Sequence, residues 1–80
     1  MTDTAILEKL GSVFGEVLGA PRLSLTRSTT AADVPGWDSL AHVELMVAVE
    51  RAFGVRLTTR EVMGLREVGD LVDLLARKAH

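Results

Sequence analysis

The sequence predicts an all-α fold, a small four-helix bundle of three longer helices and one short helix, with a long loop between the first and second helices. Apolar residues recur at helical spacing along the chain, and turn-forming residues gather in one long segment. No segment alternates apolar and polar residues as a half-buried strand does. The chain has 80 residues, which is the size of one domain, so residues 1–80 are expected to form a single domain.

The first helix is predicted from an apolar face near the N-terminus. Thr4 or Asp3 is expected to cap its start, and Gly19 with Pro21 is expected to end it. Gly15 either weakens this helix, by about 1 kcal/mol relative to alanine, or permits close packing. The apolar face follows the i, i+4, i+7, i+11 spacing of a helix through Ile6, Leu10, Val13 and Val17.

Residues 19–37 are predicted to form a long loop between the first two helices. A run rich in serine and threonine, followed by Pro35 and Gly36, supplies its turn-forming residues. A loop this long in a small domain is either functional or packs across the bundle. Leu23, Leu25 and Val34 are expected to fix the loop to the core.

The second helix is predicted from about Ser39 to Phe53, with Asp38 as its N-cap and Gly54 just after its end. This helix has more apolar surface than a small bundle can bury. One apolar stripe consists of Leu45, Val49 and Phe53, and a second stripe consists of Leu40, Val43 and Val47. Either the helix is central and wrapped by the others, or the second stripe is a docking surface for a partner. The second alternative is favoured because the stripe begins at the corner formed by residues 38 and 39.

Two shorter helical segments follow. Thr58 and Glu61 have the spacing of a capping box, which predicts a short helix that ends near Gly64. The last helix is predicted over about 68–78, and Glu67 is a weaker cap for it than threonine, so a loose start is expected. Its inward-facing residues are expected to be Val68, Leu71, Val72 and Leu75.

Composition excludes several classes of function. The chain has no cysteine and only two histidines, His42 and His80, too few for a histidine-based metal site. The net charge of −2 favours neither nucleic acid nor an anionic membrane as a partner. No apolar run approaches the roughly 20 residues of a membrane span, and the N-terminus does not resemble a secretion signal. A cytoplasmic location is therefore expected. A monomer is expected because the second apolar stripe is assigned to transient partners.

The segment where the loop meets the second helix reads Gly36-Trp37-Asp38-Ser39-Leu40, and here the sequence resembles the acyl carrier protein family. The core of that family's motif is Asp-Ser-Leu at the start of the second helix of a four-helix bundle. The resemblance continues through residues 43–45, Glu50, residues 53–55 and residues 68–75, and it covers essentially the whole chain. An isolated Asp-Ser-Leu triplet is weak evidence, but the order of helices and the loop length strengthen the match.

The resemblance implies a carrier function and no enzymatic activity. A phosphopantetheinyl transferase would join the Ser39 hydroxyl to 4'-phosphopantetheine, which would carry acyl groups as thioesters between acyl-loading and acyl-processing enzymes. Asp38 would help to position the transferase and its metal, while also capping the helix. Trp37 is expected to pack the loop against the helix. The residues implied to contact partners are Leu40, Val43, Glu44, Val47 and Arg51.

The sequence departs from familiar fatty-acid carriers in its charge. Those carriers are strongly acidic along the second helix, whereas Arg51 and Arg60 occupy positions where acids are common. Trp37 replaces a residue that is often small. The pattern looks more like free-standing carriers of polyketide, fatty-acid-like or other specialised biosynthesis, and the sequence names no cargo.

Three alternatives remain open. An aminoacyl or peptidyl carrier of a nonribosomal-peptide-type pathway would share the fold and cofactor, and a non-modified helical interaction module would share the fold alone. Ser39 and His42 lie three residues apart, a spacing that would allow a nucleophile and a base on one helix face, as in an enzyme. An enzyme would also need an orienting acid, an oxyanion hole and a substrate pocket, so His42 is expected to be a solvated surface residue.

Overall fold

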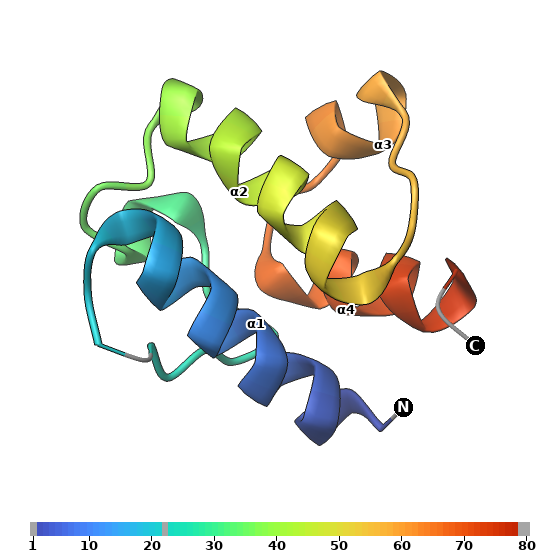
Figure 1. The fold of residues 1–80 in the computed structure, drawn as a ribbon, viewed down its shortest axis with the longest axis horizontal. Helices are drawn as coiled ribbons and strands as arrows, with labels where there is room; N and C mark the ends of the chain where they lie inside the picture. The colour runs from blue at the N-terminus through green and yellow to red at the C-terminus, as the bar shows by residue number, and fades with distance from the viewer. Residues whose placement is uncertain (1, 22, 79–80) are drawn as a thin grey trace.

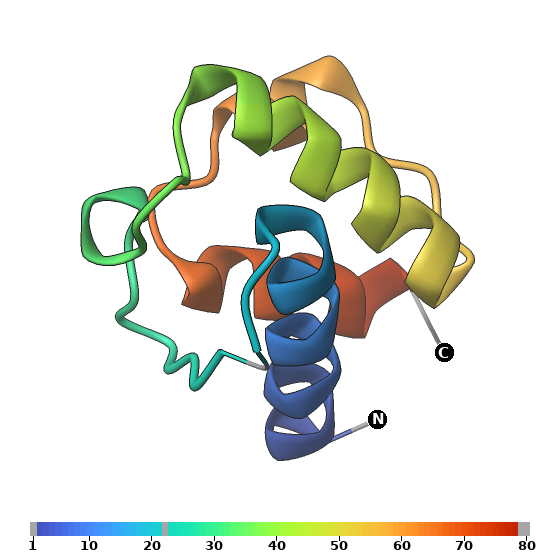
Figure 2. The same ribbon diagram turned by 60° about the vertical axis from the view of Figure 1, so that its left-hand side comes forward.

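The computed structural model describes residues 2–21 and 23–78, and these residues form helices and loops without a strand. Helix α1 spans Asp3–Leu18, and a short 3-10 turn, η1, spans Ala31–Asp33 within the long loop. Helices α2 (Ser39–Phe53), α3 (Thr59–Met63) and α4 (Val68–Lys78) follow. In Figure 1, α2 lies above α1, and the labels of α3 and α4 are to the right of α1. Figure 2 shows α4 running across α1, with α2 above both.

The core lies among α1, α2 and α4. Three residues of the apolar face predicted for the first helix are buried, namely Ile6, Leu10 and Val13, and Val17 is partly buried against them. The inward-facing residues predicted for the last helix are all buried. The stripe of α2 that faces the core contributes Leu45 and Val49, each fully buried. Phe53, from the same stripe, is partly buried against this cluster. The predicted all-α fold with a long first loop is therefore confirmed. Its buried cluster comprises Ile6, Leu10, Val13, Phe14, Leu45, Met46, Val49, Val68, Leu71, Val72 and Leu75.

A side-chain cap begins the first helix, and a glycine ends it. The Thr2 hydroxyl, not Thr4 or Asp3, accepts a hydrogen bond from the backbone N–H of Ala5 at 3.1 Å. The predicted cap is wrong because Thr2 lies three residues before the N–H that needs a partner. Gly19 ends the helix as predicted, in the left-handed conformation with φ of 68°.

The boundaries predicted for α2 and α3 are confirmed. The Asp38 carboxylate accepts from the backbone N–H of Ala41 at 2.8 Å, and Gly54 ends α2 with a left-handed φ of 65°. Thr58 and Glu61 form the predicted capping box. Both helices therefore begin and end where their local sequence places them.

The long loop packs against the bundle. Val34 is buried, and Leu23 and Leu25 pack partly buried against the core, as predicted. A Cβ atom at Gly15 would lie 2.8 Å from the carbonyl oxygen of Pro21. Glycine at this position therefore permits the close return of the loop across α1, which is the second of the two roles expected for Gly15.

Backbone carbonyl groups of the loop accept hydrogen bonds from the first N–H groups of α4. The N–H groups of Val68 and Gly69 donate to the carbonyl oxygens of Thr29 and Arg27, at 2.8 and 2.7 Å. These are N–H groups that a helix leaves without partners of its own. The Arg27 guanidinium adds ion pairs to Asp73 on α4 and to Asp3 on α1.

Asp70 completes the start of α4. The backbone N–H groups of Arg66 and Glu67 donate to its carboxylate at 2.9 and 3.2 Å. These hydrogen bonds hold the pKa of Asp70 below its ordinary value. The expectation of a loosely starting helix is wrong, because the Asp70 side chain supplies the acceptor that Glu67 does not.

We expect Asp70→Asn to be less stable than the wild type at neutral pH, with the difference shrinking in acid. A carboxylate with a depressed folded-state pKa stabilises the protein above its unfolded-state pKa, about 3.9, and this contribution is lost as the pH falls through the folded-state pKa. Urea denaturation from about pH 7 to pH 3 would measure this convergence. Glu16→Gln, an exposed α1 change, is the control. A stability gap that is independent of pH would contradict the assignment.

Candidate functional site

Ser39 is the first residue of α2 and is exposed where the loop turns into the helix. Asp38 precedes it as the N-cap and is also exposed. The helix that starts here spans Ser39–Phe53, so its dipole favours negative charge at this end. A phosphate on the Ser39 hydroxyl would meet that favourable potential. The structure thus places Ser39, the predicted attachment residue, and Asp38, predicted to position the transferase, at one accessible corner.

Trp37 anchors this corner to the bundle. Its ring meets the Phe14 ring edge-on, with centroids 5.0 Å apart and an interplanar angle of 86°. It also stacks on the His42 ring at 5.9 Å and 15°. The predicted packing role of Trp37 is therefore confirmed, and the ring joins the loop to both α1 and α2.

His42 belongs to the site, so the expectation that it lies solvated on the surface is wrong. The indole Nε1–H of Trp37 donates to Nδ1 of His42 at 3.0 Å, while Nε2 of His42 lies 3.1 Å from the carbonyl oxygen of Val62. Indole N–H groups donate only, so Nδ1 is the acceptor and the proton of the neutral ring is on Nε2, which donates to Val62. Both nitrogens are occupied, which leaves Ser39 without His42 as a base.

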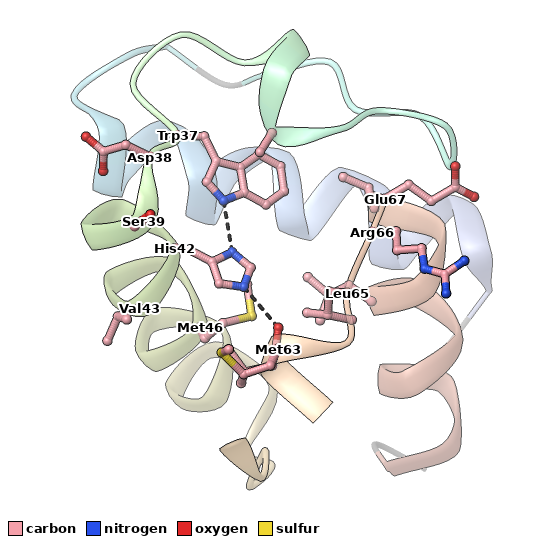
Figure 3. Close-up of a pocket in the computed structure, with 14 residues that line it drawn as sticks. Trp37, Asp38, Ser39, His42, Val43, Met46, Met63, Leu65, Arg66 and Glu67 are labelled. Carbon is pink, nitrogen blue, oxygen red and sulfur yellow. Dashed lines mark hydrogen bonds between the residues drawn. The ribbon is translucent and has the colours of Figure 1, made fainter. Parts of the chain in front are cut away.

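A cavity of about 590 Å³ opens beside Ser39, between α2, α3 and the start of α4. Most of its wall is apolar, with Val43 and Met46 from α2 and Leu65 from the α3–α4 connection. Figure 3 shows the His42 ring pointing into this space, between Trp37 and the backbone of α3. The exposed corner at Ser39 therefore adjoins a mainly apolar cavity, a feature that the sequence does not reveal.

The second apolar stripe of α2 is exposed, as the docking alternative requires. Leu40, Val43 and Val47 have exposed fractions of 71%, 58% and 43%. Met63 at the end of α3, which was not predicted, extends this surface with 79% exposed. The predicted polar neighbours are exposed as well, and they line a shallow groove of about 450 Å³ with Val47. These neighbours are Glu44 and Arg51.

Residues 2–21 and 23–78 contain no group of three or more potential metal-ligating side chains. Within the same ranges, no helix combines the length and apolar character that a membrane crossing requires. The metal role predicted for Asp38 is different, because that metal would be held jointly with a transferase. His80 lies outside the described residues.

Comparison with known proteins identifies the family. A family model described as the phosphopantetheine attachment site matches residues 8–75. The acyl carrier protein of Acidothermus cellulolyticus is 41% identical over 76 residues, which are 95% of this chain and 90% of that protein. The acyl carrier protein of Rhodococcus erythropolis is 35% identical, with coverage of 89% and 78%.

A solved structure supports the same family. The solution structure of the holo acyl carrier protein from Geobacter metallireducens matches with a TM-score of 0.82 and 38% identity, over 90% of this chain and 83% of that one. The chain belongs to the phosphopantetheine attachment site family, the family of the acyl carrier proteins. It is accordingly an acyl carrier, and its cofactor is 4'-phosphopantetheine.

Family membership also defines the general function of the chain. Members are carriers and not catalysts, so the prediction of no enzymatic activity is confirmed. A carrier interacts with a phosphopantetheinyl transferase and with acyl-processing enzymes. The exposed corner and the cavity beside it are consistent with such transient partners.

Proposed function

We propose that Ser39 is the attachment residue of the cofactor. Its hydroxyl is exposed at the N-terminus of α2, and the adjoining sequence has the Asp-Ser-Leu order of the family's motif. The hydroxyl oxygen attacks the phosphorus of coenzyme A next to pantetheine, and the pyrophosphate bond breaks with release of adenosine bisphosphate. The hydroxyl proton passes to a base of the transferase. The resulting phosphodiester remains next to the positive end of the helix dipole.

Asp38 is assigned two roles at this corner. Its carboxylate caps α2 through the backbone N–H of Ala41, which fixes the direction in which the next residue, Ser39, leaves the loop. The same side chain is exposed, so it is also free to contact the transferase and its metal. The cap uses one carboxylate oxygen, Oδ1, and the other remains available to the transferase.

The docking surface for partner enzymes consists of Leu40, Val43, Glu44, Val47 and Arg51. Its apolar members are exposed on one side of α2, next to Ser39. Exposed apolar surface of this kind marks sites of protein interaction. Arg51 adds a positive charge, which favours partners with a carboxylate opposite it.

The chain is proposed to act as a discrete, monomeric carrier in polyketide, fatty-acid-like or other specialised biosynthesis. The support is the Trp37-Asp38-Ser39 sequence and the mild net charge of −2. The named relatives are acyl carrier proteins, which favours acyl over aminoacyl cargo.

The attachment is tested by intact mass after incubation with a broad-specificity phosphopantetheinyl transferase, coenzyme A and magnesium. The wild type is expected to gain the mass of one phosphopantetheine, and Ser39→Ala is expected to gain none. Because Ser39 is exposed, the variant keeps the fold, which circular dichroism verifies. Equal modification of both proteins, or of neither, would contradict the assignment of Ser39.

The two roles of Asp38 separate in Asp38→Asn. Asparagine caps helices about as well as aspartate, so the unfolding free energy should change little, whereas the rate of modification should fall about tenfold if the charge contacts the transferase. Asp38→Ala should lose both modification rate and about 1 kcal/mol of stability. A wild-type rate for Asp38→Asn would leave Asp38 with the capping role alone.

The docking surface is tested with Val47→Ser. Covering one valine on a partner stabilises the complex by about 1.5 kcal/mol or more, so kcat/KM for the transferase should fall about tenfold. Ala76→Ser changes an exposed residue of α4 and should leave kcat/KM unchanged. A fall of the same size in both variants, or in neither, would argue against docking on this stripe.

A further inference from the structure

Two rings with polar atoms, those of Trp37 and His42, line the cavity beside Ser39. Figure 3 shows the His42 imidazole pointing into it, whereas the charged ends of Asp38, Arg66 and Glu67 point away from its centre. The rest of the wall consists of Ser39, whose hydroxyl is the proposed attachment point, and of apolar side chains such as Val43 and Leu65. The polarity of the wall therefore depends on the hydrogen bonds that His42 makes.

Those hydrogen bonds pair three polar groups with one another. The Trp37 indole donates to Nδ1 of His42, and Nε2 of His42 donates to the carbonyl oxygen of Val62. Val62 lies in the last turn of the short helix α3, where carbonyl groups lack partners within the helix. Among the described residues, no buried side-chain nitrogen or oxygen lacks a partner. The chain of bonds thus leaves neither ring with an unused N–H group.

Two kinds of cargo meet this wall differently. A hydrocarbon chain covers the paired groups without breaking a hydrogen bond, and it gains from leaving water. An oxygenated chain must give up its bonds to water and finds no free donor on the rings in return, which is unfavourable. The volume of about 590 Å³ is within the range of small-molecule sites.

We propose that the hydrogen-bond chain from Trp37 through His42 to Val62 is a specificity determinant for the cargo of this carrier. By pairing off the polar groups of the wall, it favours acyl groups with a hydrocarbon chain over acyl groups of the same length that carry oxygens along the chain. Trp37 and His42 are thus specificity residues that act through the wall and not through the thioester. The assignment of cargo rests on the proposed attachment at Ser39.

The wild type alone provides the first test. The carrier is loaded with octanoyl phosphopantetheine, or with a chain of equal length in which ether oxygens replace two methylenes. Hydroxylamine cleavage of each thioester is compared with that of the matching coenzyme A thioester. Burial against the paired wall should protect the octanoyl thioester about fivefold or more, and the ether chain less than about twofold. Equal protection of both chains, or protection of neither, would overturn the proposal.

Variants then test the hydrogen bonds themselves. Trp37→Phe keeps an aromatic ring but leaves Nδ1 of His42 without a donor, so the protection of the octanoyl thioester should fall about fivefold. His42→Leu should cause a similar loss. His42→Gln offers both an acceptor and a donor, and should keep protection within about twofold of the wild type. Unchanged protection in folded Trp37→Phe, or equal loss in His42→Gln and His42→Leu, would contradict the role of these bonds.

A further measurement separates this inference from the attachment at Ser39. Intact mass confirms loading before any cleavage rate is compared, so a failure to load counts against Ser39. The unmodified wild type is also titrated with soluble octanoyl pantetheine and with its diether analogue. The Trp37 and His42 ring signals in NMR spectra should shift with the octanoyl compound at a concentration where the analogue gives no shift. Equal shifts with both compounds, or none with either, would overturn the proposal even in a protein that is never modified.

Discussion

Trp37 makes the contacts on which the position of the Ser39 corner depends. Its ring meets Phe14 of α1, and its N–H reaches His42 of α2, which in turn bonds to the last turn of α3. A loop, two helices of the core and one short helix are thereby joined through two side chains. Helix α3 spans only Thr59–Met63, too short to be stable alone, so its position depends on such contacts. The cavity beside Ser39 is lined by Trp37 and His42 together with Val62 and Met63 of α3.

A carrier must present its attachment residue and a docking surface without losing a small core. The core is complete from one stripe of α2, with α1 and α4 supplying the facing residues. The other stripe then remains exposed, at 71% for Leu40 and 58% for Val43. Because these side chains stay exposed, they do not add the folding free energy that their burial would provide. An exposed surface of this kind is consistent with partners that bind briefly and leave.

Local sequence signals predict most of the fold. Asp38 and Gly54 bound α2, and Thr58 with Glu61 begins α3, because caps are formed by neighbours in sequence. Prediction fails where the hydrogen-bond partner of a helix end is distant in the sequence. The start of α4 is held by carbonyl groups of Arg27 and Thr29, which no local rule reveals. The start of α2 at Ser39 was predictable from its cap, whereas the cavity is formed by segments that only the tertiary structure brings together.

His42 shows why a polar side chain is hard to place from sequence. A lone histidine on a helix of a small domain is consistent with an exposed position, and its spacing from Ser39 also suggested a catalytic pair. The physical signal was Trp37, since a partly buried indole N–H needs an acceptor, and His42 is the acceptor that α2 brings to it. Once Nδ1 accepts that bond, the remaining nitrogen must donate, and the nearby carbonyl group of Val62 receives it. One donor in the loop therefore determines the tautomer of His42, the anchoring of α3 and the polarity of the cavity wall.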